Sequence, residues 1–114
     1  MVGEMEQEQE KDTMIQLIQT DSFRETRSAG LLPTPLLDAG KARALLLELA
    51  AGQSVAPCQM PFLVLYYFIE GRGQLRVGEE QTAFQPGSLV AVEAEAVRSI
   101  AADHPTRVLA VQVP

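Results

Sequence analysis

From Thr13 onward the chain contains short apolar runs, separated at close intervals by glycine and proline. Short runs of this kind between turn residues are typical of the strands of a β-sandwich or barrel. The pattern therefore predicts an all-β domain. The apolar runs are residues 14–18, 42–49, 62–69, 74–77, 89–92, 97–101 and 107–113.

Turn residues between the runs are signals for β-hairpins. Glycines occupy the turn at residues 70–73, a Gly-Glu-Glu segment occupies residues 78–80, and a Gln-Pro-Gly segment at residues 85–87 precedes an apolar run. Glycine supplies the positive φ angles that tight turns require, and proline fixes its own φ. We therefore expect the second half of the chain to be β structure.

One segment disagrees with the all-β pattern. Residues 42–51 consist mainly of strong helix formers and are followed by Gly52, which by propensity alone predicts a helix that ends at a glycine. The local pattern does not decide between a helix and a strand in this segment.

Residues 52–113 resemble the cupin family of small double-stranded β-helix barrels. Residues 68–80 look like the central hairpin of that family, and residues 85–90 look like the turn that follows it. The resemblance implies one cupin-type, jelly-roll-like barrel. It also makes residues 42–49 a strand that enters the first cupin motif, with tertiary pairing overriding helix propensity.

The resemblance places four residues of this chain where the family carries metal ligands. Gly52 and Gly71 of the first family motif and Gly87, which opens the second, are present, but each ligand place holds a different residue type. Cys58 and Met60 stand at two histidine places, Val64 at the glutamate place and Arg98 at the histidine place of the second motif.

These residue types do not suit a divalent transition metal, which needs about three convergent imidazole or carboxylate groups. Arg98 is the strongest argument against a metal, because a guanidinium is a permanent cation without a lone pair and would repel a divalent cation. The single histidine, His104, lies six residues further on in an expected turn, toward the far end of the barrel. We therefore predict no metal and no cofactor. Metal-dependent dioxygenase and isomerase activities, and epimerase activity with a histidine base, do not fit this chain.

Alternation along residues 62–69 assigns Phe62 and every second residue after it to one face of a strand, which the resemblance places inside the barrel. Arg98 is the one strongly polar group expected there. An apolar cavity with a fixed cation suits a small organic acid, held by a bidentate carboxylate pair. The predicted ligand-binding residues are Cys58, Met60, Phe62, Val64, Tyr66 and Arg98.

Other interpretations of the same residues stay open. The cavity could be filled by its own side chains, with Arg98 paired to Glu93, to Glu95 or to a backbone carbonyl. The barrel could be a metal-independent isomerase or lyase that uses Tyr66, Cys58 or Arg98, or a structural barrel that acts only through association. Cys58 and Met60 are also soft donors that could hold monovalent copper or form a redox-sensing site.

The other face of residues 62–69 is apolar as well. A strand that faces water on one side normally alternates apolar and polar residues. We therefore expect this face to be covered by the N-terminal segment or by a second subunit, and we predict a homodimer.

Length and charge complete the prediction. At 114 residues the chain has room for one domain, and residues 1–12 carry four of the six net negative charges. We expect a disordered acidic tail at residues 1–12 and a cupin-like domain at residues 13–114. The acidic balance opposes nucleic-acid binding, and no run of about 18 apolar residues predicts a membrane span. The first residues are too acidic for a signal peptide, so we expect a soluble cytoplasmic protein.

Overall fold

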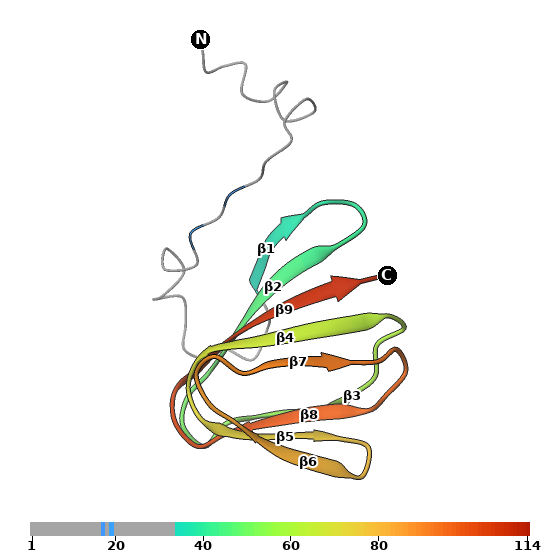
Figure 1. Cartoon of the computed structure of the whole chain (residues 1–114). Coiled ribbons are helices and arrows are strands. Elements are labelled where there is room, and N and C mark those ends of the chain that lie inside the picture. The colour runs from blue at the N-terminus through green and yellow to red at the C-terminus, as the bar shows by residue number, and fades with distance from the viewer. Residues whose placement is uncertain (1–16, 18, 20–33) are drawn as a thin grey trace.

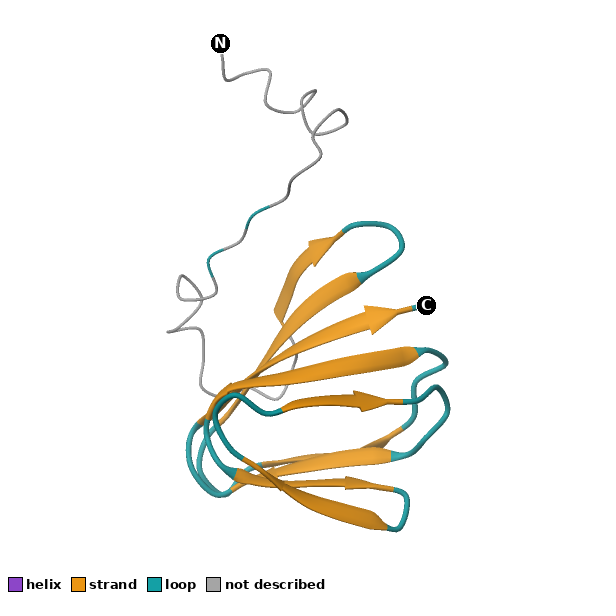
Figure 2. Cartoon of the chain, in the orientation of Figure 1, coloured by secondary structure: helices purple, strands orange, loops and turns teal. Residues whose placement is uncertain are grey.

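The computed structural model describes residues 34–114 together with Leu17 and Gln19. The described residues form nine strands and no helix (Figures 1 and 2), which confirms the all-β prediction. The strands are β1 (Thr34–Asp38), β2 (Arg43–Leu49), β3 (Ser54–Cys58), β4 (Leu63–Glu70), β5 (Gly73–Val77), β6 (Glu80–Phe84), β7 (Leu89–Val92), β8 (Arg98–Ala102) and β9 (Thr106–Val113).

Two predictions concern residues that the structure does not describe. The acidic tail at residues 1–12 lies outside the described residues, as does the apolar run at residues 14–18 apart from Leu17, which is exposed. Within the described residues, no helix is long and apolar enough to span a membrane.

The strands form two antiparallel sheets. One sheet has five strands in the order β1-β2-β9-β4-β7, and the other has four strands in the order β3-β8-β5-β6. Figure 1 shows the two sheets as two layers, with the chain crossing repeatedly from one to the other. Apolar side chains of both sheets fill the space between the layers, as in other double-sheet barrels.

The predicted turns are found, but only the turn at residues 78–80 closes a hairpin, between β5 and β6. The hairpin prediction for residues 70–73 is wrong, because β4 and β5 belong to different sheets, and so do β6 and β7 on either side of residues 85–87. Gly71 explains the first crossing. It has a φ of 108°, and a Cβ atom there would collide with Thr106 at the start of β9. Glycine therefore serves close chain crossing rather than strand reversal.

Residues 43–49 form strand β2, so the strand implied by the resemblance is confirmed over the helix. β2 pairs with β9 in an unbroken register from Arg43 opposite Gln112 to Leu49 opposite Thr106, and with β1 on its other side. Pairing on both sides satisfies the backbone of a segment whose local propensity is helical. Gly52 lies in the turn after β2, with a φ of 86°.

Three strands, β1, β3 and β6, were not among the predicted runs. Each of them lies at the edge of its sheet. Edge strands tolerate polar residues and proline, since one side of the strand needs no partner. β6 is exposed along most of its length and β3 contains Pro57, so neither shows the apolar pattern of a central strand.

The predicted alternation of β4 is confirmed. Val64, Tyr66 and Phe68 are buried at 1%, 5% and 0% exposure, whereas Tyr67 is 40% exposed. The ring of Phe68 stacks on that of Phe84, with centroids 4.0 Å apart. This stack lies toward the end of the barrel where β4 passes into β5, and the space there is filled by side chains.

Candidate functional site

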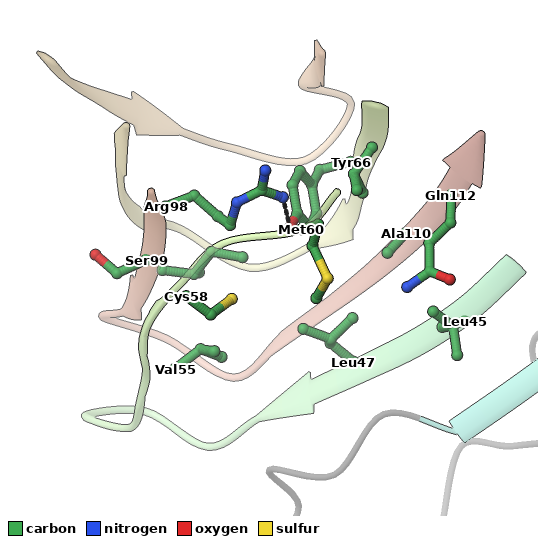
Figure 3. Close-up of a pocket in the computed structure, with 12 residues that line it drawn as sticks. Leu45, Leu47, Val55, Cys58, Met60, Tyr66, Arg98, Ser99, Ala110 and Gln112 are labelled. Carbon is green, nitrogen blue, oxygen red and sulfur yellow. Dashed lines mark hydrogen bonds between the residues drawn. The ribbon is translucent and has the colours of Figure 1, made fainter. Parts of the chain in front are cut away.

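A cavity of about 160 Å³ lies between the two sheets, toward the end where β8 begins (Figure 3). Five of the six predicted site residues line it. They are Cys58 on β3, Met60 in the following loop, Val64 and Tyr66 on β4, and Arg98 on β8. The β3–β8 pairing sets Cys58 directly opposite Arg98, so residues 40 positions apart in sequence are neighbours.

Phe62 is not among the residues that line the cavity. It lies in the bend before β4, where the regular alternation of the strand has not yet begun, and it packs against the core. His104 is exposed in the turn between β8 and β9, where its backbone N–H donates to Arg72. As expected, it lies at the opposite end of β8 from Arg98.

Residues on the far wall of the cavity were not predicted from the sequence. β2 contributes Leu45 and Leu47, and β9 contributes Ala110 and Gln112. The local pattern of residues 42–51 did not decide between a helix and a strand, so no inward face could be assigned to that segment. Gln112 had a signal that could have found it, since it is the one polar residue between Val108 and Val113.

Arg98 is the charged group of the cavity, and only 2% of its surface is exposed. Its Nε donates to the carbonyl oxygen of Ala96 at 3.0 Å, its Nη1 to the Tyr66 hydroxyl at 3.0 Å, and its Nη2 to the carbonyl oxygen of Glu93 at 3.4 Å. All three partners are neutral oxygens. Of the five N–H groups of a guanidinium, two are therefore left for another acceptor.

No carboxylate of the described residues forms a salt bridge with Arg98. The alternative in which Arg98 pairs with the side chain of Glu93 or Glu95 is therefore not what the structure shows. Arg98 instead donates hydrogen bonds to the backbone carbonyl oxygens of Glu93 and Ala96. A buried cation held only by neutral groups is costly, because hydrogen bonds replace only part of its hydration.

The turn between β7 and β8 holds Arg98 in place. Glu95 has a φ of 71°, in the left-handed region, and its N–H donates to the carbonyl oxygen of Met60 at 2.7 Å. The side-chain amide of Gln59 donates to the carbonyl oxygen of Glu95 at 2.9 Å. The turn is thus fastened to the loop after β3, and it presents the carbonyl groups of Glu93 and Ala96 to the guanidinium.

The Tyr66 hydroxyl accepts a hydrogen bond from Arg98, so its own hydrogen is available for a second partner. Burial raises the pKa of Tyr66 above its ordinary value, and this effect exceeds the lowering caused by Arg98; Cys58 adds a small further rise. Tyr66 is therefore a neutral hydrogen-bond donor at neutral pH. Arg98 and Tyr66 together form a donor pair suited to an anionic oxygen.

The residues present do not fit the divalent metal of metal-binding cupins. Cys58 and Met60 offer sulfur atoms, Val64 offers no donor, and Arg98 adds a positive charge at a ligand place. Across the described part of the chain, no three His, Cys, Asp or Glu side chains are grouped so that they could hold a metal ion. Donors of this kind do not build an imidazole and carboxylate site.

Comparisons with known proteins place the fold. No family model matches the sequence, and no curated protein is similar to it in sequence. Solved structures are similar at low identity. A Thermus thermophilus protein is 21% identical, with a TM-score of 0.78 over 88% of this chain and 98% of that one.

Two further structures carry descriptions of their fold. A cupin superfamily protein from Desulfitobacterium hafniense is 20% identical, with a TM-score of 0.73 over 89% of this chain and 92% of that one. An uncharacterized conserved Klebsiella pneumoniae protein with a double-stranded β-helix domain is 14% identical, with a TM-score of 0.78 over 88% and 90% of the two chains. The chain therefore has a double-stranded β-helix fold, similar to the folds of these structures.

Proposed function

We propose that this protein binds a small organic acid in the cavity between its sheets, with Arg98 as the anchor for the carboxylate. The observation that carries the proposal is the buried Arg98 guanidinium, 2% exposed and surrounded by neutral partners. A bound carboxylate would supply the missing counter-charge. Charge-assisted hydrogen bonds of this kind are about twice as strong as neutral ones.

The surroundings of Arg98 suit the rest of such a ligand. The two remaining N–H groups of Arg98 and the O–H of Tyr66 can donate to the carboxylate oxygens. Leu45, Leu47 and Ala110 provide an apolar wall for a hydrocarbon portion. The volume of about 160 Å³ is close to that of an engineered apolar cavity of about 150 Å³ that binds benzene. This size supports an acid with roughly six carbon atoms.

The test compares acids with neutral analogues in thermal-shift and calorimetric titrations. Hexanoate and benzoate should raise the unfolding temperature, and hexanamide and benzamide should not. A ligand at a hundred times its dissociation constant adds about 2.7 kcal/mol to the free energy of unfolding. Arg98→Met should weaken acid binding by roughly a hundredfold, since a charged hydrogen-bond pair is lost.

The matched control is Arg76→Met, the same substitution at an exposed arginine of β5. This variant should bind acids as the wild type does. Equal acid binding by Arg98→Met and the wild type would overturn the proposal, and so would the absence of any acid that stabilises the wild type. The second result would favour a barrel that acts through association alone. Conversion of a bound acid, lost in Tyr66→Phe, would instead identify an enzyme.

We also propose that the protein forms a homodimer through the outer face of its five-stranded sheet. Register pairs Leu46 with Leu109, Leu109 with Tyr67, and Tyr67 with Leu89, so these apolar side chains form one row across four strands. Leu46 is 1% exposed, but Tyr67 and Leu89 are 40% and 66% exposed. Two copies of the exposed part can cover each other, because a two-fold contact needs only one self-complementary surface.

Light scattering tests this dimer. The wild type should show twice the mass of the 12.4 kDa chain at micromolar concentration. Leu89→Glu should shift it to a monomer, whereas Val97→Glu, at a residue that is 43% exposed outside the row, should leave it dimeric. A monomeric wild type at that concentration would contradict the proposal.

A further inference from the structure

A further polar side chain, Gln112 of β9, lies in the same cavity as Arg98 and Tyr66 (Figure 3). The register places Gln112 opposite Val64, an inward-facing residue that is 1% exposed. The carboxamide of Gln112 makes no hydrogen bond to the described residues. It is therefore a free donor and acceptor in a mostly apolar cavity.

Arg98 and Gln112 belong to different sheets. Arg98 begins β8 of the four-stranded sheet, and Gln112 lies near the end of β9 in the five-stranded sheet. In Figure 3 the two side chains stand on different sides of the cavity, with Met60 between them in that view. A ligand anchored at Arg98 can therefore place its far end near Gln112.

We propose that the preferred ligand is a monocarboxylate with a neutral hydrogen-bonding group, such as a hydroxyl or a carbonyl, at the end away from the carboxylate, and that Gln112 selects this group. The inference rests on the proposed function and deepens it. An amide can donate to a carbonyl or hydroxyl oxygen and accept from a hydroxyl. A polar group that finds such a partner regains the hydrogen bond that it loses on leaving water.

Charge argues against a ligand whose end away from the carboxylate is a second carboxylate or an ammonium group. Gln112 is neutral, and its neighbours in the cavity wall, Leu45 and Ala110, are apolar. A second carboxylate there would lack a buried cation, since Arg98 is the only cationic residue that lines the cavity in the described structure. Arg43 lies opposite Gln112 in the β2–β9 register, but it is exposed and does not line the cavity. An ammonium group would lack an anion, because no aspartate or glutamate side chain of the described residues lines it either. An unpaired charge is far more costly to bury than a paired neutral group.

The experiment uses four acids with the same six-carbon chain: hexanoate, 6-hydroxyhexanoate, adipate and 6-aminohexanoate. The four- and five-carbon homologues are measured beside them, so that a difference in ligand length does not decide the result. Titration calorimetry should show that the best hydroxy acid binds the wild type about three- to tenfold more tightly than the matched alkanoate, the range expected for one neutral hydrogen bond. Adipate and 6-aminohexanoate should bind more weakly than both.

Two variants separate the role of Gln112 from that of Arg98. Gln112→Leu should remove the preference for the hydroxy acid while keeping hexanoate binding. Gln112→Glu, which has nearly the same shape, should improve binding of 6-aminohexanoate and weaken that of adipate. Gln81→Leu, at an exposed residue of the edge strand β6, is the control and should keep the wild-type order of affinities.

The outcomes distinguish this inference from the proposed function. If hydroxy acids and alkanoates bind equally at every chain length, or if Gln112→Leu keeps the preference, the role of Gln112 is overturned while Arg98-dependent binding stands. If no acid binds the wild type, the proposed function fails and the inference fails with it.

Discussion

The two ends of the barrel interior share strands β4 and β9 but differ in what their side chains do. Toward one end, the rings of Phe68 and Phe84 stack with centroids 4.0 Å apart, and Val108 is fully buried. Toward the other end, the same strand β4 contributes Tyr66, beside Arg98, to a cavity of about 160 Å³. Strand alternation decides which residues face inward, and residue type then decides whether the interior is filled or left open.

The filled end is also where the backbone passes most closely. A Cβ atom on Gly71 would collide with Thr106, and one on Gly73 would collide with the carbonyl oxygen of Ala101. The open end has a turn fastened by hydrogen bonds from Glu95 and Gln59 instead. The filled end is therefore built for packing, and the open end for holding one cation in a fixed position.

The largest effect is expected from Phe68→Ala at the filled end. Phe68 has no exposed surface, so its removal leaves a cavity in the packed core. The free energy of unfolding should fall by about 3–5 kcal/mol, measured by urea denaturation. Val97→Ala, at a residue that is 43% exposed, is the control and should change it by less than about 0.5 kcal/mol. A loss below about 1 kcal/mol for Phe68→Ala would show that this end is loosely packed.

Arg98→Met at the open end should act in the opposite direction when no ligand is present. The substitution removes a buried cation that has no carboxylate partner and replaces it with an apolar chain. Replacement of buried charges by apolar residues is often neutral or stabilising by about 1–4 kcal/mol. The free energy of unfolding should therefore stay unchanged or rise, with Arg76→Met as the control. A loss of about 3–5 kcal/mol would instead show that Arg98 is part of a compensated charge network.

A smaller effect is expected in the titration of Tyr66. The chain has two tyrosines, so in Tyr67→Phe the tyrosinate absorbance reports Tyr66 alone. Its midpoint should lie above the ordinary value of 10.0, because burial raises the pKa of Tyr66 more than Arg98 lowers it. Adding Arg98→Met should raise the pKa further, since the hydrogen bond and positive charge of Arg98 are removed. A midpoint at or below the ordinary value would contradict the buried position of the hydroxyl.

The same shift has a consequence for stability. The folded state holds the Tyr66 proton more tightly than the unfolded state, whose pKa is about 10. The contribution to stability is therefore complete below about pH 10 and is lost as the pH rises through the folded-state pKa. Tyr66→Phe should lack this part of the alkaline decrease, which denaturation curves between neutral and alkaline pH would show.

Most of the fold and part of the candidate site could be predicted from the sequence, and the reasons differ from residue to residue. Alternation divided residues 62–69 into two faces, which is a local property of a strand, and the resemblance assigned the face of Val64 and Tyr66 to the interior, because both faces are apolar. The order of strands in the sheets was not accessible. Whether the turn at residues 70–73 closes a hairpin depends on whether β4 and β5 pair with each other, and they belong to different sheets. The edge strands β1, β3 and β6 were missed because they lack a long apolar run, whereas the edge strand β7 has one and was predicted.

The site shows the same limit. The ligand places of the two family motifs led to Cys58, Met60 and Arg98, and the structure brings these together. The partners of Arg98 could not be predicted, since they are backbone carbonyls whose direction is set by the turn at residues 93–97. Gln112 was missed because its role depends on the register between β4 and β9.

The smallest effect is expected at this turn, from Glu95→Gly. Glu95 has a φ of 71°, which costs a residue with a side chain about 1–2 kcal/mol, whereas glycine adopts it freely. Glycine also gives the unfolded chain more freedom, which offsets part of the gain. The free energy of unfolding should therefore rise by at most about 1 kcal/mol.

Glu93→Gly is the matched control for this prediction, because Glu93 is exposed in the same turn but does not have a positive φ. It should lower the free energy of unfolding by about 0.5–1 kcal/mol. Acid binding should stay within about twofold of wild type in both variants, since each keeps its backbone carbonyl groups and Arg98 keeps its partners. Opposite signs for the two substitutions would show that strain in this turn is local to Glu95. Equal losses would show that the turn is held by its hydrogen bonds to Met60 and Gln59, with no strain for glycine to relieve.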